Sequence, residues 1–227
     1  MNTLRLIAIG ALAFLSSALC NAQDRQLSAL EKSMEEIGLV DISKLDNTIL
    51  IDLKYATTDN FTGVVLYDSM RYAYLHPLAA EKLVKAQENL KKIDPNLTLL
   101  VYDAARPLSI QQIMFDKVKN TRHQSYVANP SKRGLHNFGI AVDLTISDLE
   151  GNALDMGTPF DYFGRAAAIR DEEGLVKEGV LNRNQVNNRK LLRKIMLDAG
   201  FLSILGEWWH FNAISLSQAK KECKLIE

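Results

Sequence analysis

Two short stretches of the chain carry side chains that can bind a metal. In RGLHNFGIAVDLTI, His136 is followed seven residues later by Asp143, and in GEWWHFN, Glu207 precedes His210 by three. Two imidazoles and one carboxylate form a usual ligand set for catalytic zinc, which keeps a fourth position for water. A further carboxylate that stays off the metal can act as general base on that water. The residue types are therefore consistent with metal-assisted hydrolysis and equally with hydrogen-bonded core histidines, and their spacing alone leaves both interpretations open.

The spacing of these residues restricts how they can meet. Positions seven apart on a straight strand face opposite sides of the sheet, so His136 and Asp143 cannot share an ion within one regular strand. We expect His136 to lie in the loop before the strand, with Gly139 allowing the chain to turn or bulge. The same argument predicts Glu207 at a turn and His210 on a strand.

Other candidate residues have weaker surroundings. Arg106, in VYDAARPLS, follows a buried-strand pattern and could hold an oxygen that gains negative charge, or could form an ordinary salt bridge. Ser217 and Lys220 form an S-x-x-K pattern of penicillin-interacting serine enzymes, but the S-D-N and K-T-G patterns that accompany it are absent. His76 and His123 are interpreted as helix-flanking or solvated residues.

The periodicity of the chain predicts both strands and helices. Strand patterns cover 49–55, 97–104, 138–146 and 208–212, and helix patterns cover 77–93, 107–118 and 189–200. The stretch 119–135 is interpreted as a loop, and 147–185 has little periodicity. A long irregular segment is uncommon in a compact domain unless it covers a functional site. Strands separated by single helices, without regular βαβ alternation, favour the α+β class.

The N-terminus has the pattern of a secretory signal peptide over residues 1–22. Arg5 lies in a short n-region, an apolar run covers 6–15, and Ala22 suits the position before the cleavage site. A bilayer span needs about 20 apolar residues, so this run is too short to remain in a membrane. We expect an exported, periplasmic protein whose catalytic domain is 23–227, with no stable membrane insertion after cleavage.

The composition is that of one ordinary globular domain. The 227 residues are 47% hydrophobic and 24% charged. With Arg5 removed, 26 basic residues face 27 acidic ones, which gives no attraction to nucleic acid or an anionic membrane. Loss of Cys20 with the signal leaves Cys223 alone, so no internal disulfide can form. A lipid anchor on Cys20 is the alternative, disfavoured by the bulky Leu19 before it. The oligomeric state cannot be read from one chain.

Six segments occur together and in a fixed order: KYATTDNFTG (54–63), YDAARP (102–107), HNFGIAVDLT (136–145), MGTPFDYF (156–163), NNRKLLRKIMLDAGF (187–201) and GEWWHF (206–211). Together they resemble the zinc D-alanyl-D-alanine dipeptidases, within the wider family of zinc D,D-peptidases. The resemblance covers about 46–212. It implies a small single α+β domain with a central antiparallel sheet flanked by helices, and hydrolysis of D-Ala-D-Ala or a closely related dipeptide with one zinc ion per chain.

The resemblance also assigns roles to the candidate residues. It implies that zinc is held by His136, Asp143 and His210. Glu207 would be the base that activates the water and later passes the proton to the leaving amine. Arg106 would stabilise the oxygen of the tetrahedral intermediate.

The same resemblance implies how the substrate is held, and shows one departure. The contacts to the substrate ammonium fall on Tyr55 and Asp161. The family usually has serine two residues before the first histidine ligand, where it helps to hold the substrate carboxylate, and this chain has Gly134 there. Ser131 or Arg133 could compensate. The dipeptide preference is therefore left open.

Two rival functions share part of this pattern. A D,D-carboxypeptidase that trims peptidoglycan stem peptides would use the same zinc site, although the KYAT and PFDY segments favour a small free dipeptide. In a dipeptidase, the irregular 147–185 segment would cover the site, place Asp161 near the amino end of the substrate and exclude longer chains. A catalytically silent peptidoglycan-binding module is the second rival, and the intact set of four metal-site residues argues against it.

Overall fold

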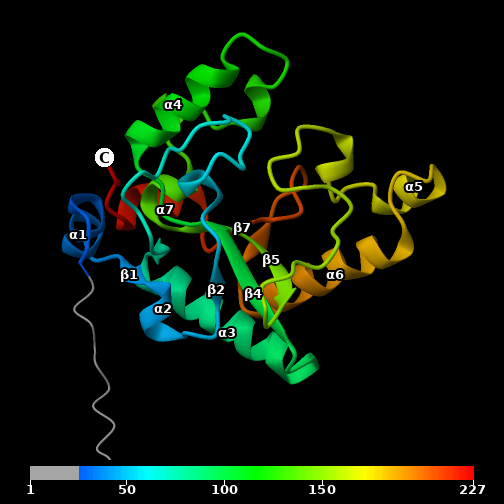
Figure 1. Cartoon of the computed structure of the whole chain (residues 1–227). Coiled ribbons are helices and arrows are strands. Elements are labelled where there is room, and N and C mark those ends of the chain that lie inside the picture. Colours follow the sequence, from blue (N-terminus) through cyan, green and yellow to red (C-terminus); the bar gives the residue numbers. More distant parts are fainter. Residues whose placement is uncertain (1–25) are drawn as a thin grey trace, which may run out of the picture.

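The computed structural model describes residues 26–227, so the predicted signal peptide lies outside the described part (Figure 1). The longer elements are α1 Ala29–Glu36, α3 Pro77–Ile93, β4 Leu97–Asp103, α4 Leu108–Val118, β5 Ala141–Asp148, α5 Glu172–Lys177, α6 Arg183–Asp198 and α7 Leu216–Glu222. The short ones are β1 Val40–Asp41, α2 Ile42–Leu45, β2 Leu50–Ile51, β3 Tyr74–Leu75, β6 Leu202–Ser203 and β7 His210–Asn212. Within 26–227, no helix combines the length and the apolar character that a membrane span requires.

A five-stranded sheet forms the centre of the fold, in the order β2-β4-β5-β7-β6. The pairs β4–β5, β5–β7 and β7–β6 are antiparallel, whereas the short edge strand β2 runs parallel to β4. Strands β1 and β3 form a separate two-stranded antiparallel sheet. The architecture is α+β with a central sheet flanked by helices, which confirms the predicted class.

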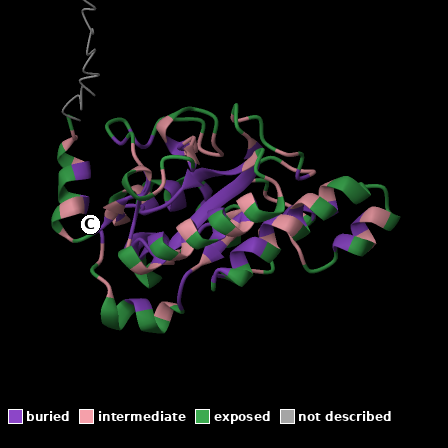
Figure 2. Cartoon of the chain, turned by 90° about the horizontal axis from the view of Figure 1, so that it is seen from below, coloured by how far each residue is buried: buried purple, intermediate pink, exposed green. Residues whose placement is uncertain are grey.

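Helices α3 and α6 pack against each other and against the central sheet, while α4 and the long loops lie on the other side of it (Figure 1). In α3 the buried positions Ala79, Leu83, Ala86 and Leu90 recur at helical spacing, so one face meets the sheet. All of β5 except its last residue is buried. Figure 2 shows the strands buried between helices that keep one exposed face.

Several elements follow the sequence pattern closely. Helix α3 has the predicted bounds, with Pro77 in its first turn and His76 as the N-cap whose Nδ1 accepts from the N–H of Leu78. Helix α4 begins one residue later than predicted because Pro107 is its N-cap. Strand β4 covers most of the predicted 97–104 strand.

Other boundaries differ from the prediction. The strand expected over 49–55 ends at Ile51, and residues Lys54–Ala56 form a 3-10 turn that buries Tyr55. The strand expected from residue 138 begins at Ala141. Helix α6 begins at Arg183, six residues before the predicted start, where Asn182 and Gln185 form a capping box.

Candidate metal centre and substrate pocket

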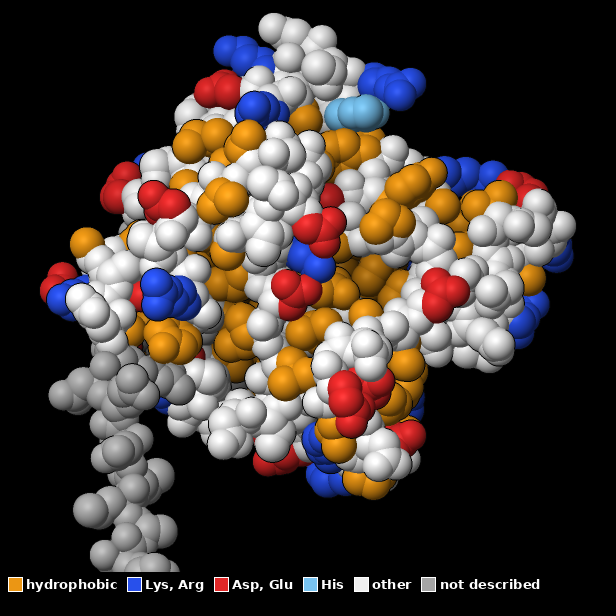
Figure 3. Space-filling view, in the orientation of Figure 1, with side chains coloured by type: hydrophobic (Ala, Val, Ile, Leu, Met, Phe, Trp, Pro, Cys, Tyr) orange, Lys and Arg blue, Asp and Glu red, His pale blue; other side chains and the backbone are white. Residues whose placement is uncertain are grey.

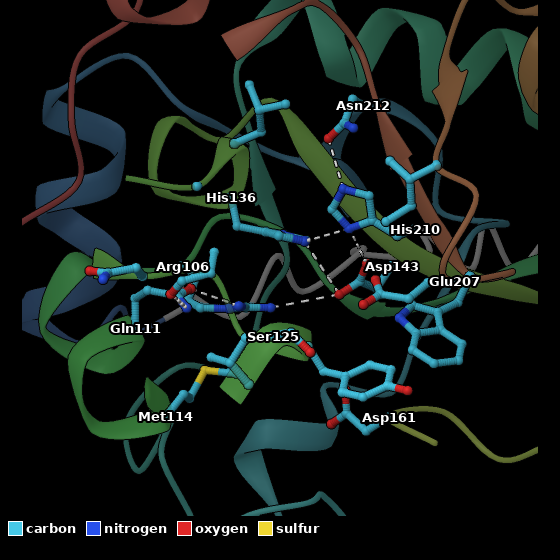
Figure 4. Close-up of a pocket in the computed structure, with 18 of the residues that line it drawn as sticks. Arg106, Gln111, Met114, Ser125, His136, Asp143, Asp161, Glu207, His210 and Asn212 are labelled. Carbon is cyan, nitrogen blue, oxygen red and sulfur yellow. Dashed lines mark hydrogen bonds and ion pairs between the residues drawn. The ribbon is translucent and has the colours of Figure 1, made fainter. Parts of the chain in front are cut away.

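Three of the predicted metal-binding residues meet at one point of the sheet (Figure 4). Asp143 on β5 and His210 on β7 are directly paired in the antiparallel register. His136 lies in the 3-10 turn Leu135–Phe138 before β5. One ligand atom from each residue lies within 4.8 Å of the others, and no further such cluster occurs among residues 26–227.

Gly139 makes the turn that separates His136 from the strand. Its φ of 64° is in the left-handed region, where residues with a side chain are strained. A Cβ at this position would lie 2.9 Å from Leu39 Cδ2 and 3.0 Å from the backbone nitrogen of His76. Glycine is therefore required on both counts, and the predicted turn between His136 and Asp143 is confirmed.

Both imidazoles are oriented by acceptors on their outer nitrogens. His136 Nδ1 donates to the carbonyl oxygen of Ala104 at 2.7 Å, and His210 Nε2 donates to Asn212 Oδ1 at 2.8 Å. Each ring therefore keeps its other nitrogen for the cluster. His136 Nε2 lies 3.2 Å from His210 Nδ1 and 3.3 Å from Asp143 Oδ2, and His210 Nδ1 lies 2.9 Å from Asp143 Oδ1.

The charges of this cluster fit a cation. Burial would raise the pKa of Asp143, but His136 and His210 hold it well below its usual range. Burial lowers the pKa of His210, but its hydrogen bond to Asp143 and that residue's charge raise it to about 8. Without a cation, a proton between His210 and Asp143 relieves the repulsion of facing lone pairs. A divalent ion would take the place of that proton, so the donor set suits zinc.

Glu207 lies in the bend before β7, as its spacing from His210 predicts, and lines the same pocket. Burial raises the pKa of Glu207 to about 7, with a further increase from Asp143 and opposing effects from His210 and Arg106. A carboxylate that titrates close to neutrality has the proton affinity of a general base.

Arg106 lies beside the cluster and is held by a buried carboxylate. Its Nε donates to Asp103 Oδ2 at 2.9 Å, its Nη2 donates to the same oxygen, and its Nη1 donates to Gln111 Oε1 at 2.8 Å. The hydroxyl of Tyr67 donates to Asp103 Oδ1 at 2.7 Å. Arg106 Nη2 lies 3.6 Å from Asp143 Oδ2, so the guanidinium also faces the ligand carboxylate. The salt bridge that the sequence left as an alternative is present, and the guanidinium also lies beside the cluster. The role of Arg106 toward a substrate oxygen stays a prediction.

Tyr55 and Asp161, which are 106 positions apart, meet in the pocket wall. The hydroxyl of Tyr55 donates to Asp161 Oδ2 at 2.9 Å, and the ring of Tyr55 lies 5.2 Å from Arg106 Cζ. Burial and the charge of Asp143 raise the pKa of Asp161 to about 8, against the lowering effect of Tyr55. The pair therefore favours a neutral carboxyl until a positive group arrives.

The pocket that joins these residues has a volume of about 420 Å³, a size typical of small-molecule sites. Its wall includes Trp209, whereas Trp208 packs edge-on against Trp209 and donates its indole N–H to Thr158 Oγ1 at 2.8 Å. Phe61 and Phe163 also line it, with ring centroids 5.0 Å apart. Figure 3 shows hydrophobic side chains between the loops on this face, mixed with charged groups of both signs.

The remaining sequence candidates lie outside the pocket. Ser217 and Lys220 are on α7 and do not line it, so no serine-lysine site is formed there. His76 caps α3, and His123 packs against Tyr126 and Phe163 in the loop after α4.

Four supporting residues were not predicted from the sequence. Asp103 ends a buried strand, and a carboxylate there requires a partner, so its position three residues before Arg106 was a usable signal. Asn212 lies two residues after His210 on a strand, and therefore on the same face. Gln111 could not be recognised from the sequence, because it is one of several polar residues in its helix. Ala104 contributes a carbonyl oxygen, which no side-chain pattern reveals.

A family comparison identifies the class. A family model described as D-ala-D-ala dipeptidase matches residues 34–224. The chain belongs to this family of peptidases, in which zinc dependence is typical, so the resemblance seen in the sequence is confirmed. The family is one of hydrolases, and the chain is accordingly an enzyme.

Individual relatives carry the same description. The chain is 35% identical over 174 residues to D-alanyl-D-alanine dipeptidase of Escherichia coli (strain K12), covering 77% of this chain and 83% of the relative. It is 30% identical over 194 residues to D-alanyl-D-alanine dipeptidase of Enterococcus faecium, covering 78% and 91%. For D-alanyl-D-alanine dipeptidase of Streptomyces coelicolor, the identity is 32% over 192 residues, covering 75% and 89%.

Proposed function

We propose that this chain is an exported zinc dipeptidase that hydrolyses D-Ala-D-Ala or a closely related dipeptide. Family membership supports the hydrolysis of a dipeptide. The observation that carries the zinc assignment is the set of three mutually facing ligand atoms, each imidazole having its other nitrogen bound to an acceptor. The names of the relatives support D-Ala-D-Ala as substrate.

The residues that would hold the ion are His136 through Nε2, His210 through Nδ1 and Asp143 through a carboxylate oxygen. When bound there, zinc supplies Lewis acidity and a water that can attack a carbonyl at neutral pH. The carbonyl of Ala104 and the amide of Asn212 keep both rings in the orientation that ligation requires.

Glu207 acts as the general base in this proposal. It takes a proton from the attacking water and returns it to the amine that leaves. Its pKa of about 7 applies to the cluster without a cation. A positive charge at the three ligands lowers that pKa, so the carboxylate is ionised at neutral pH and ready to accept the proton.

Arg106 stabilises the negative charge that develops on the carbonyl oxygen. Three of its five N–H groups are used by Asp103 and Gln111, which leaves one on Nη1 and one on Nη2 for the substrate. Because Asp103 holds the guanidinium before the substrate arrives, no reorganisation is needed during the reaction.

Asp161 and Tyr55 bind the free ammonium of the substrate. An ammonium beside Asp161 favours ionisation of this carboxyl, and the hydroxyl of Tyr55 already donates to it. A substrate with a blocked amino end lacks this charge. The segment 157–163, which carries Asp161, therefore supports the selection of a dipeptide over a longer chain.

Export through a signal peptide of residues 1–22 is part of the same proposal. It rests on Arg5, the apolar run 6–15 and the small residue Ala22. N-terminal sequencing of protein recovered from the periplasm should begin at Gln23. Recovery of the chain with Met1 in the cytosol would contradict export and leave the proposed chemistry untouched.

The experiment that tests the activity follows the release of D-alanine by mature protein. One substrate is D-Ala-D-Ala, and the other is an N-acylated tripeptide ending in D-Ala-D-Ala. Each is incubated with the protein alone, with a chelator, and with zinc restored. We expect zinc-dependent cleavage of the dipeptide alone.

The other outcomes are also informative. Cleavage of the blocked tripeptide would move the enzyme to the D,D-carboxypeptidases. Release from neither substrate by zinc-loaded protein would contradict the proposed activity. Cleavage of the dipeptide that survives complete removal of metal would contradict the zinc assignment.

A further inference from the structure

The pocket has two chemically different parts. Tyr55, from the 3-10 turn Lys54–Ala56, and Asp161, from the irregular segment after β5, form a part that suits a positive group. Lys132 and Arg133, from the 3-10 turn Pro130–Lys132 and the residue that follows it, line the same pocket and add positive charge to it. A dipeptide with both ends free carries a charge of each sign, and the two parts match those charges.

We propose that Arg133, with Lys132 beside it, binds the C-terminal carboxylate of the dipeptide and replaces the hydroxyl that Gly134 lacks. The inference rests on the proposed function, since it concerns how the same substrate is held. A guanidinium binds a carboxylate through two parallel N–H bonds, which a single hydroxyl cannot do.

Two other donor groups of this pocket, the Gln111 amide and the Gly134 N–H, are already used. Gln111 Oε1 accepts from Arg106 Nη1, and Gln111 Nε2 donates to the carbonyl oxygen of Ala128 at 2.8 Å. The backbone N–H of Gly134 donates to Asn137 Oδ1 at 2.8 Å. Ser125 also lines the pocket, but its hydroxyl is neutral, and a carboxylate pairs more strongly with a cation.

Ser131, the other predicted substitute for the missing serine, points elsewhere. Its hydroxyl donates to Asn129 Oδ1 at 2.8 Å. It lines a separate hollow beside Leu108 and Glu227 and does not line the main pocket. Of the two substitutes that the sequence left open, Arg133 alone lines the substrate pocket.

The charges of Lys132 and Arg133 are available to a ligand. Within residues 26–227, neither forms an ion pair with a carboxylate. Arg106, by contrast, is paired with the buried Asp103. The uncompensated positive charge of the pocket therefore comes from Lys132 and Arg133, and a substrate carboxylate would balance it.

The backbone sets the direction in which the Arg133 side chain leaves the turn. Arg133 has a φ of 59°, which is uncommon for a residue with a long side chain, and its N–H donates to the carbonyl of Pro130 at 3.1 Å. Asn129 closes the same turn by accepting from the N–H of Ser131 at 2.9 Å. Strained residues of this kind persist where the surrounding structure imposes them, often in binding sites.

Gly134 itself offers a way to test the assignment. A Cβ at this position would lie 3.5 Å from Ala128 Cβ and 3.6 Å from Asn137 Oδ1, which are ordinary contacts. The backbone of Gly134 has a φ of −90°, which any residue adopts. A serine therefore fits here, and Gly134→Ser can supply a hydroxyl without disturbing the turn.

The experiment measures the binding of D-Ala-D-Ala and of its C-terminal amide by calorimetry. The protein is zinc-loaded and carries Glu207→Ala, so that the ligand is not hydrolysed. The added substitutions are Arg133→Gln, Arg133→Lys, and Arg133→Gln with Gly134→Ser. Arg122→Gln is the matched control, because Arg122 is an exposed arginine of the neighbouring loop that lines a different hollow.

We expect Arg133→Gln to weaken dipeptide binding by about 10- to 100-fold, as for loss of a hydrogen bond to a charged group, and to leave binding of the amide unchanged. Arg133→Lys should lose less, and Gly134→Ser should restore part of the affinity. Arg122→Gln should bind like the parent protein.

Equal binding of the dipeptide by Arg133→Gln and its parent would overturn the inference. So would equal binding of the dipeptide and the amide by the parent, or binding of neither. Turnover by protein that retains Glu207 separates the two proposals. Binding that depends on Arg133 without any hydrolysis would contradict the proposed function alone, and hydrolysis with binding that ignores Arg133 would contradict this inference alone.

Discussion

The three candidate metal ligands and the candidate substrate-binding residues of the pocket are carried by different kinds of backbone. Asp143 and His210 face each other across a hydrogen-bonded pair of central strands. Tyr55, Asp161 and Arg133 come instead from 3-10 turns and irregular segments, and two of them have positive φ. Two of the three candidate ligands are therefore positioned by the central sheet, and His136 is buried in the turn that leads into β5. The other side of the pocket is carried by turns and loops.

The candidate metal ligands and the candidate substrate contacts therefore depend on different parts of the backbone. Ligand atoms must be held to within a fraction of an ångström, which strands achieve more reliably than loops. Loops tolerate substitution without loss of the fold, so they can change which ligand is bound. Gly134 lies at the junction, only two residues before His136. Its departure from the family serine affects the substrate side and leaves the cluster intact.

The largest effect is expected at Glu207, on the cluster side. Replacement by alanine removes the general base, so kcat should fall on the order of 10³-fold. The measurement is D-alanine release from D-Ala-D-Ala at saturating zinc. Glu173→Ala is the control, because Glu173 is exposed on α5 and pairs only with surface cations. A kcat within a few fold of the wild type would contradict the assignment of the base.

The next effect concerns Asp103, which supports Arg106 from the core. Asp103→Asn leaves the buried guanidinium of Arg106 without its nearest counter-ion, so the free energy of unfolding should fall by about 3 kcal/mol and kcat should fall with it. Denaturant unfolding and turnover measure the two changes. Asp52→Asn is the matched control, because its salt bridge with Lys54 is partly exposed and contributes at most about 1 kcal/mol. Equal losses of unfolding free energy and of kcat in Asp103→Asn and Asp52→Asn would contradict a supporting role for Asp103.

A smaller effect is expected for Asn212, which orients His210. Asn212→Ala removes the acceptor from His210 Nε2, and loss of such a partner typically weakens metal binding by about 10- to 100-fold. Competition with a chromophoric zinc chelator measures the affinity. Asn152→Ala, at an exposed turn after β5, is the control. Unchanged zinc affinity in Asn212→Ala would show that the ring needs no support from this amide.

The smallest effect is a gain of stability on the loop side. The folded pKa of Asp161 is about 8, above its unfolded value, so the fold loses stability as pH rises between the two values. Asn cannot ionise, so Asp161→Asn removes this pH-dependent loss of stability. Asn also tolerates the positive φ of this position. Metal-free Asp161→Asn should be more stable than the wild type at pH 8 and should differ little from it at pH 4. A gain independent of pH would contradict the raised pKa.

The elements predicted well from the sequence are those with strong local signals. Helix α3 has Pro77 at its start and an apolar stripe at helical spacing, and its predicted bounds are those observed. Strands β1, β2, β3 and β6 span two residues each, and only their tertiary partners stabilise them. The alternation over 49–55 did not reveal the 3-10 turn that carries Tyr55.

The candidate site was predictable to the extent that it depends on side-chain type. His136, Asp143, Glu207 and His210 have types and spacing that suggest metal chemistry, and the position of Gly139 resolved the spacing of the first two. The carbonyl oxygen of Ala104, which accepts from His136, is a backbone group that every residue has. The sequence therefore cannot single it out. The pairing of Tyr55 with Asp161 brings together segments 106 positions apart, and no local pattern encodes it.

The most direct test of the account is the zinc content of purified protein, measured by atomic emission after dialysis against trace zinc. We predict one zinc per chain in the wild type, one in Glu207→Ala, and none in His210→Ala. This outcome would separate the ligand from the base, although the two residues are three positions apart. Zinc lost from Glu207→Ala, or retained in full by His210→Ala, would contradict the central claim.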